Sequence, residues 1–94
     1  MEKVTNGIRR LAVAWAKYNI QVNCIVPGWL KTELTKPVYE HPEMGPTILQ
    51  RTPAGRWGTP DDMRGIAIFL ASHAADFVTG QAIPVDGGFS VMGI

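Results

Sequence analysis

The fold is decided at residues 20–28, which read IQVNCIVPG. Branched apolar side chains dominate the run up to Val26, and the run ends abruptly at Pro27-Gly28, as a buried strand that leads into a loop does. The sequence therefore predicts a strand over residues 20–26. Cys24, the only cysteine of the chain, lies inside this strand, so we expect a small buried side chain without an intrachain disulfide.

A helix is predicted before the strand, over residues 4–18. Its larger apolar side chains recur at the spacing of one helix face: Val4, Ile8, Leu11 and Trp15. Residues 11–16 are apolar almost all the way round, which indicates burial on two sides. This helix therefore needs a second packing partner, without which Leu11, Val13 or Trp15 would remain in water.

A long irregular segment follows the strand. Residues 29–58 contain Pro37, Pro42, Pro46 and Pro53. These prolines rule out a long helix and leave only short helical turns, with one expected around residues 47–50. Segments of this length without regular structure are usually functional when they occur inside a compact domain. The loop is therefore the first candidate for a site.

A second helix is predicted over residues 60–74. Thr59 supplies an N-cap hydroxyl, and Pro60 suits the first helical position. Asp61 and Asp62 fall in the first turn, where the helix dipole favours carboxylates. We interpret both as capping residues rather than as a catalytic pair, and we interpret His73 as a histidine at the helix end.

A second strand is predicted over residues 81–85, closed by the turn Asp86-Gly87-Gly88. Pro84 has no N–H to give to a strand ladder, so this strand should lie at a sheet edge. We interpret the two glycines as a positive-φ turn with no helix after them. Strand, crossover helix and strand form a βαβ unit, which predicts an α/β fold with two parallel strands in one incomplete domain, residues 1–94.

The composition excludes several classes of function. The chain is 46% hydrophobic and 18% charged, which is typical of a globular protein, and its formal net charge of +1 argues against nucleic acid as a partner. No apolar run is long enough to cross a bilayer and no leader is visible, so we expect a cytoplasmic protein without membrane contact. His41 is interpreted as a solvated loop residue, and no metal is predicted because neither histidine has ligand neighbours at a suitable spacing.

Residues 22–33, VNCIVPGWLKTE, resemble the strand and loop of classical short-chain dehydrogenases, for which the family pattern is V-N-x-I-x-P-G-x-x-x-T. Three further strings follow in the family's order: RTPAGRWGTPDD at residues 51–62, FLAS at 69–72, and VTGQ to VDGG at 78–88. The resemblance covers nearly the whole chain. The exact residues of these strings, together with AKYNI at residues 16–20, are most similar to those of the gluconate 5-dehydrogenase group.

The resemblance implies the C-terminal βαβ portion of a Rossmann-type, doubly wound parallel sheet. It also implies an NAD(P)-dependent oxidoreductase in which the loop after the first strand holds the carboxamide of the nicotinamide ring. Carried over residue by residue, the expected cofactor-binding residues are Pro27, Gly28, Leu30 and Thr32. Ligands of open parallel sheets bind beyond the carboxyl ends of the strands, which is where these residues follow.

The resemblance also predicts what this chain lacks. The glycine-rich turn that holds the pyrophosphate in the family has no counterpart here. Alignment of the first helix puts the family's catalytic lysine near Met1 and its tyrosine before the chain. Lys3 is displaced by about 200° around a helix, and neither Tyr18 nor Tyr39 has a lysine four residues later. We therefore expect no catalytic residue and no tight binding of NAD or NADP.

Two functions of different class stay open. In the first, the chain is a truncated piece of the oxidoreductase, inactive alone. In the second, it is a non-catalytic module that binds itself or a full-length relative. Because the strand over residues 20–26 would lack a neighbour on one side, both readings predict a homo-oligomer, most simply a dimer.

Two side-chain roles are also open in the loop. Trp29 and Trp57 either line a substrate pocket or plug one. Arg56 is expected to pair with Asp61 or Asp62.

Overall fold

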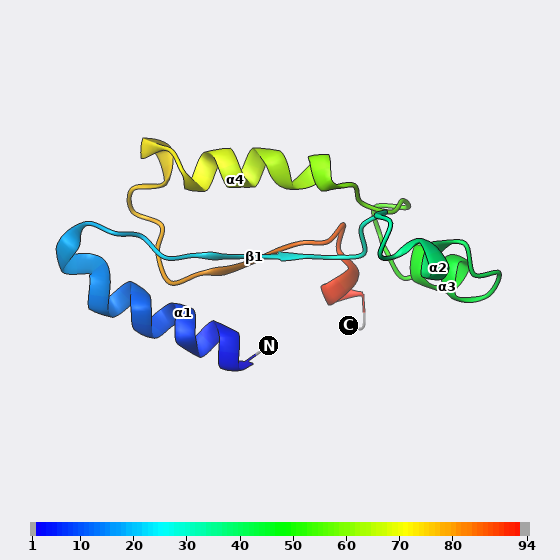
Figure 1. The fold of residues 1–94 in the computed structure, drawn as a ribbon, viewed down its shortest axis with the longest axis horizontal. Coiled ribbons are helices and arrows are strands. Elements are labelled where there is room, and N and C mark those ends of the chain that lie inside the picture. Colours follow the sequence, from blue (N-terminus) through cyan, green and yellow to red (C-terminus); the bar gives the residue numbers. More distant parts are fainter. Residues whose placement is uncertain (1, 93–94) are drawn as a thin grey trace. The chain divides into compact units, whose positions relative to one another are not determined.

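The structure, a computed structural model, describes residues 2–92. Its regular elements, in chain order, are α1 (Glu2–Trp15), β1 (Cys24–Pro27), α2 (Lys36–Tyr39), α3 (Met44–Gln50), α4 (Arg64–Leu70) and β2 (Ala82–Val85) (Figure 1). Short 3-10 turns occur at Ala16–Tyr18, Pro60–Met63, His73–Ala75 and Phe89–Val91. The contacts divide the chain into two compact units, one running up to Val26 and including Gly65–Ile83, the other made of Pro27–Arg64 and the chain from Pro84 onward.

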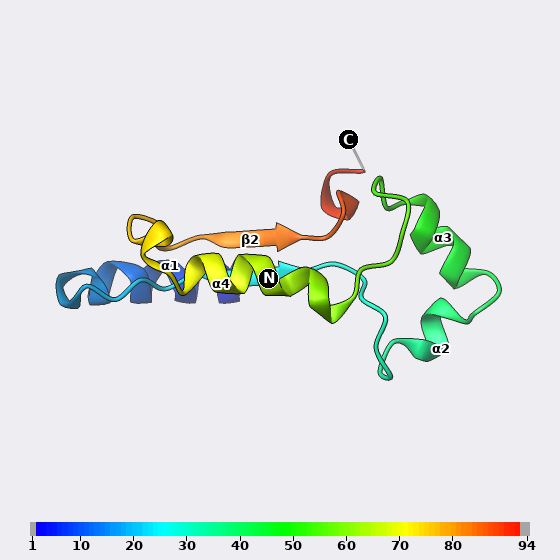
Figure 2. The ribbon, with the colours of Figure 1, turned by 90° about the horizontal axis from the view of Figure 1, so that it is seen from above.

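The two strands form a parallel pair, which confirms the α/β class. Cys24 N–H donates to the Gln81 carbonyl at 2.8 Å, and Gly28 N–H donates to the Val85 carbonyl at 3.1 Å. The partners advance together along both strands, as parallel pairing requires. Figure 2 shows the arrow of β2 beside the end of β1.

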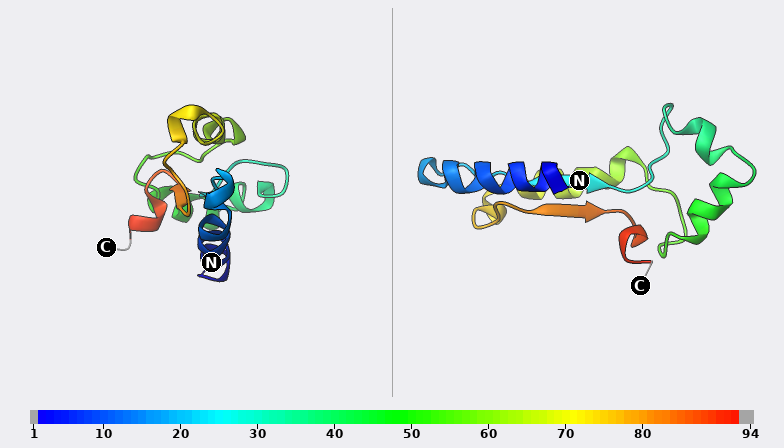
Figure 3. Two further views of the ribbon diagram at one scale, coloured as in Figure 1. Left: turned by 90° about the vertical axis from the view of Figure 1, so that its left-hand side faces the viewer. Right: turned by 90° about the horizontal axis from the view of Figure 1, so that it is seen from below.

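In the first unit, α1 and α4 lie on opposite faces of the strands (Figures 1 and 3). Its core is thin: Ala12 and Ala75 are the buried apolar residues among those described, and no large side chain there is fully buried. Val13 is 80% exposed and Trp15 41% exposed. The expected burial of the α1 helix on two sides is therefore not found within the described residues, and its apolar side chains do remain in water.

The first strand begins later than predicted, at Cys24 rather than at residue 20. The reason is a side-chain interaction ahead of it. Asn23 Nδ2 donates to the Val78 carbonyl at 2.9 Å, and its Oδ1 accepts from Gln81 N–H at 3.2 Å. Asn23 thus bridges the turn that leads into β2. Cys24 is free and half-buried, so the prediction of a buried cysteine was wrong.

The second helix is shorter than the apolar repeat predicted. It starts with a 3-10 turn at Pro60–Met63, and α4 ends at Leu70. Ser72 Oγ donates to the Phe69 carbonyl at 2.8 Å, so a side chain satisfies a carbonyl of the last turn. His73 accordingly does not end the helix but begins a separate 3-10 turn, with its Nδ1 3.2 Å from Asp76 Oδ2.

Candidate functional site

The first strand ends where a glycine and an aspartate come together. A Cβ atom on Gly28 would lie 2.5 Å from Asp86 Cβ and 2.7 Å from its Cα. Only glycine permits this approach between the end of β1 and the turn after β2. Pro27 is the last residue of β1 and is exposed, so the predicted site residues Pro27 and Gly28 together terminate the strand.

The loop after the strand is closed at its base by the backbone. Leu30 and Gly58 form an isolated parallel bridge. In this bridge Gly58 N–H donates to the Trp29 carbonyl at 3.0 Å, and Lys31 N–H donates to the Gly58 carbonyl at 2.9 Å. We call residues 30–58, which contain α2 and α3, the bridged loop (Figure 2).

Three aromatic rings pack edge to face at this base. The ring centroids of Trp29 and Trp57 are 5.8 Å apart at 70°, and those of Trp57 and Tyr39 are 5.8 Å apart at 69°. Such geometry is favourable for aromatic pairs. A cavity of about 130 Å³ beside them is lined by Trp29 but not by Trp57. The cavity is smaller than the roughly 300 Å³ of a typical small-molecule pocket. The edge-to-face contacts anchor Trp57 between Trp29 and Tyr39, while Trp29 also lines the cavity.

Two threonines form the polar centre of the bridged loop. Thr35 Oγ1 donates to the Leu30 carbonyl at 2.5 Å and accepts from Thr32 N–H at 2.9 Å. Thr35 N–H in turn donates to Thr32 Oγ1 at 3.3 Å, and the two hydroxyl oxygens are 3.3 Å apart. Both side chains are half-buried. The predicted site residue Thr32 is thus held by a residue that the sequence pattern did not single out.

The backbone of Leu30 complements this pair. The bridge to Gly58 uses the backbone groups of Trp29 and Lys31, so the N–H and C=O of Leu30 face the other side, where the carbonyl accepts from Thr35. One N–H donor and one hydroxyl therefore lie on neighbouring stretches of the same loop. This set matches the acceptor and donor of a primary amide.

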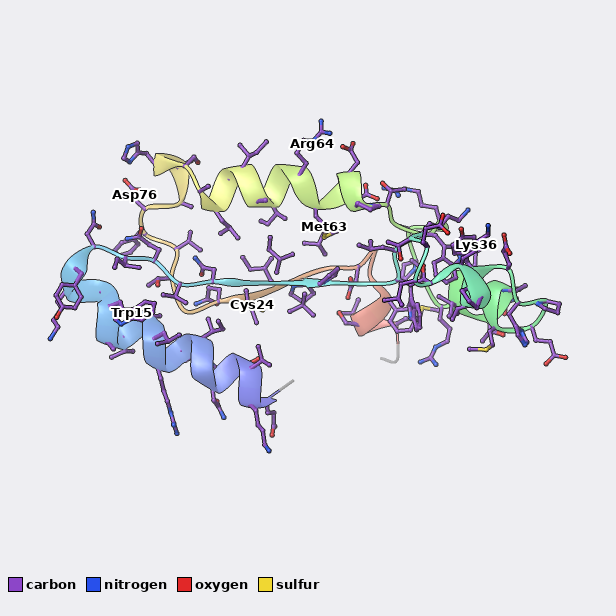
Figure 4. The ribbon with its side chains drawn as sticks, in the orientation of Figure 1. Trp15, Cys24, Lys36, Met63, Arg64 and Asp76 are labelled. Atoms are coloured by element: carbon purple, nitrogen blue, oxygen red, sulfur yellow. The ribbon has the colours of Figure 1, made fainter. Side chains whose placement is uncertain are left out.

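Arg56 is paired with Asp62, as expected. Its two terminal nitrogens contact the two carboxylate oxygens, each at 2.9 Å, and Thr59 N–H donates to Asp62 Oδ2 at 2.8 Å. The hydrogen bonds from Arg56, and next that from Thr59, hold the pKa of Asp62 well below its ordinary value. Asp61 pairs with Arg64 instead. Figure 4 shows Met63 and Arg64 pointing to opposite sides of the chain at the start of α4.

This pair predicts an acid-sensitive contribution to stability. A carboxyl group whose pKa is lower in the folded than in the unfolded state stabilises the fold at pH values above the ordinary aspartate pKa of about 3.9. This contribution is lost as the pH falls below that value. Asp62→Asn should therefore lower the urea midpoint at pH 7 and flatten its decline between about pH 5 and pH 2. Asp61→Asn is the matched control, since its pair is more exposed. Equal acid dependence in wild type and Asp62→Asn would contradict the assignment.

The turn after β2 is fixed by its aspartate. Asp86 Oδ1 accepts from Gly88 N–H at 2.9 Å, and Oδ2 accepts from Ser90 N–H at 3.1 Å. The Ser90 hydroxyl, followed by these amides, lowers the pKa of Asp86. Gly87 and Gly88 have φ of 64° and 93°, which confirms the positive-φ turn. The expectation that no helix follows was wrong, because Gly88 precedes the 3-10 turn Phe89–Val91.

His41 has a role that the sequence did not predict. Its Nδ1 accepts from Glu43 N–H at 3.1 Å and from Met44 N–H at 3.0 Å, at the start of α3. It is exposed and lies outside the helices, which confirms the solvated loop histidine, and the two hydrogen bonds at the start of α3 are an addition to that prediction. Helix-capping preferences, which favour Ser, Thr, Asp and Asn, give no sequence signal for this role of His41.

Metal-ligand clusters and membrane-spanning helices are both absent from the part of the chain that the structure describes. Across residues 2–92 no three His, Cys, Asp or Glu side chains gather in a way that suits a metal ion. None of the helices in that range has the length and apolarity of a membrane span.

Residues 3–90 match the family model described as enoyl-(acyl carrier protein) reductase. With its parallel strands and the loop at their carboxyl ends, the chain belongs to the short-chain dehydrogenase/reductase family. It is 51% identical over 84 residues to a 2-dehydro-3-deoxy-D-gluconate 5-dehydrogenase of Dickeya dadantii, covering 88% of this chain and 33% of that protein. A gluconate 5-dehydrogenase of Gluconobacter oxydans is 40% identical over 88 residues, covering 94% of this chain and 34% of the relative.

Solved structures agree with these relatives. A gluconate 5-dehydrogenase from Burkholderia cenocepacia, in complex with NADP and tartrate, has a TM-score of 0.89 at 43% identity, covering 94% of this chain and 34% of that one. The predicted resemblance, including that to the gluconate 5-dehydrogenase group, is confirmed. The chain spans about a third of the length of the relatives it matches.

Proposed function

We propose that this chain supplies the nicotinamide-contacting loop of an NAD(P)-dependent oxidoreductase. The proposal is carried by two groups on the loop at the carboxyl end of a parallel strand. One is the backbone donor Leu30 N–H, which the bridge to Gly58 leaves unused, and the other is the Thr32 hydroxyl. The names of the relatives point to sugar acids and polyols as the substrate class.

The residues present fit the cofactor's amide. Leu30 N–H would donate to the carboxamide oxygen, and the Thr32 hydroxyl would contact the amide nitrogen. Pro27 and Gly28 end the strand and would leave room for the ring beyond it. When bound, the nicotinamide supplies the hydride acceptor or donor for a redox reaction. The role of this chain is to bind and orient the ring. Holding the reacting groups at a fixed distance and angle lowers the entropic cost of reaching the transition state.

The chain alone should be inactive. Residues 1–94 contain no tyrosine followed four residues later by a lysine and no glycine-rich turn for a pyrophosphate. We expect no turnover above a heat-killed control with NAD or NADP on gluconates, polyols or hydroxy acids. Calorimetry should show no micromolar binding of either nucleotide, because only the nicotinamide end finds partners. Turnover that persists through further purification, or micromolar affinity, would contradict the proposal.

A second candidate function is a self-associating module. The observation that favours it is the exposure of large apolar side chains on the first unit, among them Val13, Ile68 and Phe77. Within the described residues, β1 pairs with β2 and with no other strand, so one edge of each is open. We propose a homo-oligomer built on these surfaces, with a second copy or a full-length relative as the partner. A Tyr-x-x-x-Lys segment encoded in frame upstream would favour the oxidoreductase piece.

A further inference from the structure

We propose that His41 is a pH-sensitive switch for the hairpin that α2 and α3 form within the bridged loop, residues 36–50. In its neutral form the ring holds the first backbone N–H groups of α3. A proton on Nδ1 releases these groups, and the start of α3 opens. The inference goes beyond the proposed function, because it concerns the state of the hairpin and holds whether or not the loop contacts a cofactor.

The directions of the two hydrogen bonds to the His41 ring are fixed by their donors. Glu43 N–H lies 3.1 Å from Nδ1 and Met44 N–H lies 3.0 Å from it. A backbone N–H can only donate, and a ring nitrogen accepts only when it carries no proton. The contacts therefore require a neutral His41 with its proton on Nε2.

Three successive N–H groups at the start of α3 depend on His41. A helix leaves its first N–H groups without partners inside the helix. Two of them, those of Glu43 and Met44, donate to the His41 ring, and the third, Gly45 N–H, donates to the His41 carbonyl at 3.1 Å. The side chain of Glu43, the N-cap residue, makes no capping hydrogen bond. The His41 ring thus does the work that an N-cap side chain does elsewhere.

Protonation reverses the chemistry of these contacts. In the charged imidazolium both ring nitrogens carry a proton, so Nδ1 would face two N–H donors with a third. The positive charge would also lie at the helix end where positive charge is unfavourable. A histidine changes its charge in the range between about pH 8 and pH 5. The ring should therefore leave the start of α3 within that range.

The charged groups around the hairpin do not replace the lost bonds. Its titratable side chains, those at its two ends included, are Lys36, Tyr39, Glu40, Glu43 and Arg51. In the range 2–92, none of them forms an ion pair with His41. The carboxylates of Glu40 and Glu43 would attract an imidazolium, but pairs between exposed side chains are weak. Neither carboxylate restores an acceptor at the Nδ1 position.

The opening should spread across the hairpin but not to the base of the bridged loop. Gly45 is buried, and a Cβ atom there would lie 2.6 Å from the Tyr39 carbonyl, so α3 touches α2 at its first turn. The bonds that join Lys31 and Gly58 at the base contain no histidine. The ion pair of Asp62 responds only at more acid pH, because the pKa of that carboxyl is lowered. The two responses are therefore separated on the pH axis.

The first arm of the test is NMR of the full 94-residue chain at pH 8 and pH 5. At pH 8 the nitrogen signals of His41 should show the tautomer with its proton on Nε2. The protection factors of the Glu43 and Met44 amides, which correct for the intrinsic pH dependence of exchange, should be roughly fivefold or more lower at pH 5. Those of Lys31 and Gly58 should stay unchanged. An Nδ1–H tautomer at pH 8, or equal protection of Glu43 and Met44 at both pH values, would overturn the inference.

The second arm uses variants to assign the response to one ring. His41→Asn supplies a side-chain oxygen that accepts N–H groups at a helix start and does not titrate, so protection should persist at both pH values. His41→Ala removes the acceptor, so protection should be low at both. His73→Asn is the matched control, because it removes the other histidine, which lies beside Asp76 outside the hairpin. A response that survives in His41→Asn, or one that disappears in His73→Asn, would overturn the switch.

Discussion

Trp15→Glu is expected to abolish both the assembly and the fold of the purified chain. Wild type should scatter light at micromolar concentration as a dimer or larger species rather than as the 10.3 kDa monomer. Trp15 lies on α1 and is 41% exposed within one chain, beside Val13 at 80%. If a partner covers this face, a carboxylate there would lie buried without a counter-charge, which is strongly unfavourable.

The size of the expected effect follows from the apolar surface area that assembly would cover. Covering about 800 Å² of apolar surface contributes up to about 20 kcal/mol before the costs of association and ordering. This is large against a small domain's stability of about 5 kcal/mol, so folding and assembly should be coupled. Val22→Glu, ahead of the open strand edge, should act in the same way.

Asn6→Glu is the matched control, because it adds the same charge to an exposed polar position of α1. It should leave the mass and the unfolding midpoint unchanged. A folded wild-type monomer of 10.3 kDa would show that the exposed apolar face is not an interface.

Gly28→Ala is expected to be the most damaging small substitution in the second unit. The new methyl group would lie 2.5 Å from Asp86 Cβ and 2.7 Å from its Cα, so backbone has to move. Overpacking of this kind typically costs about 1–3 kcal/mol, visible as a lower urea midpoint. Gly7→Ala is the control, since nothing lies within 4 Å of its Cβ position and alanine should stabilise α1 by about 1 kcal/mol. Equal midpoints in wild type and Gly28→Ala would contradict the close approach.

The regular elements were predictable where a periodic pattern exists. The spacing of Val4, Ile8, Leu11 and Trp15 located α1, and the β-branched run before Pro27 located β1. The start of β1 was not predictable, because it depends on Asn23 reaching the Val78 carbonyl far along the chain. At the early end of α4 the Ser72 hydroxyl donates to the Phe69 carbonyl. The spacing of apolar residues carries no information about such a bond.

The candidate site was predictable only in part. Pro27, Gly28, Leu30 and Thr32 come from the family pattern, and their contact with a cofactor stays a prediction. Thr35 escaped notice because its hydrogen bonds to the Leu30 carbonyl and from Thr32 N–H join residues whose distances only the structure gives. The spacing Thr-x-x-Thr before a helix was the available signal, since such hydroxyls bond to nearby backbone.

The two hydrogen bonds that join Trp29 and Lys31 to Gly58 have an evolutionary consequence. A loop whose ends are tied to each other can change in length between them at little entropic cost. Insertions between the tied ends are therefore expected to be tolerated, except near Ala54, whose N–H donates to the Gly87 carbonyl in the turn after β2 at 2.9 Å.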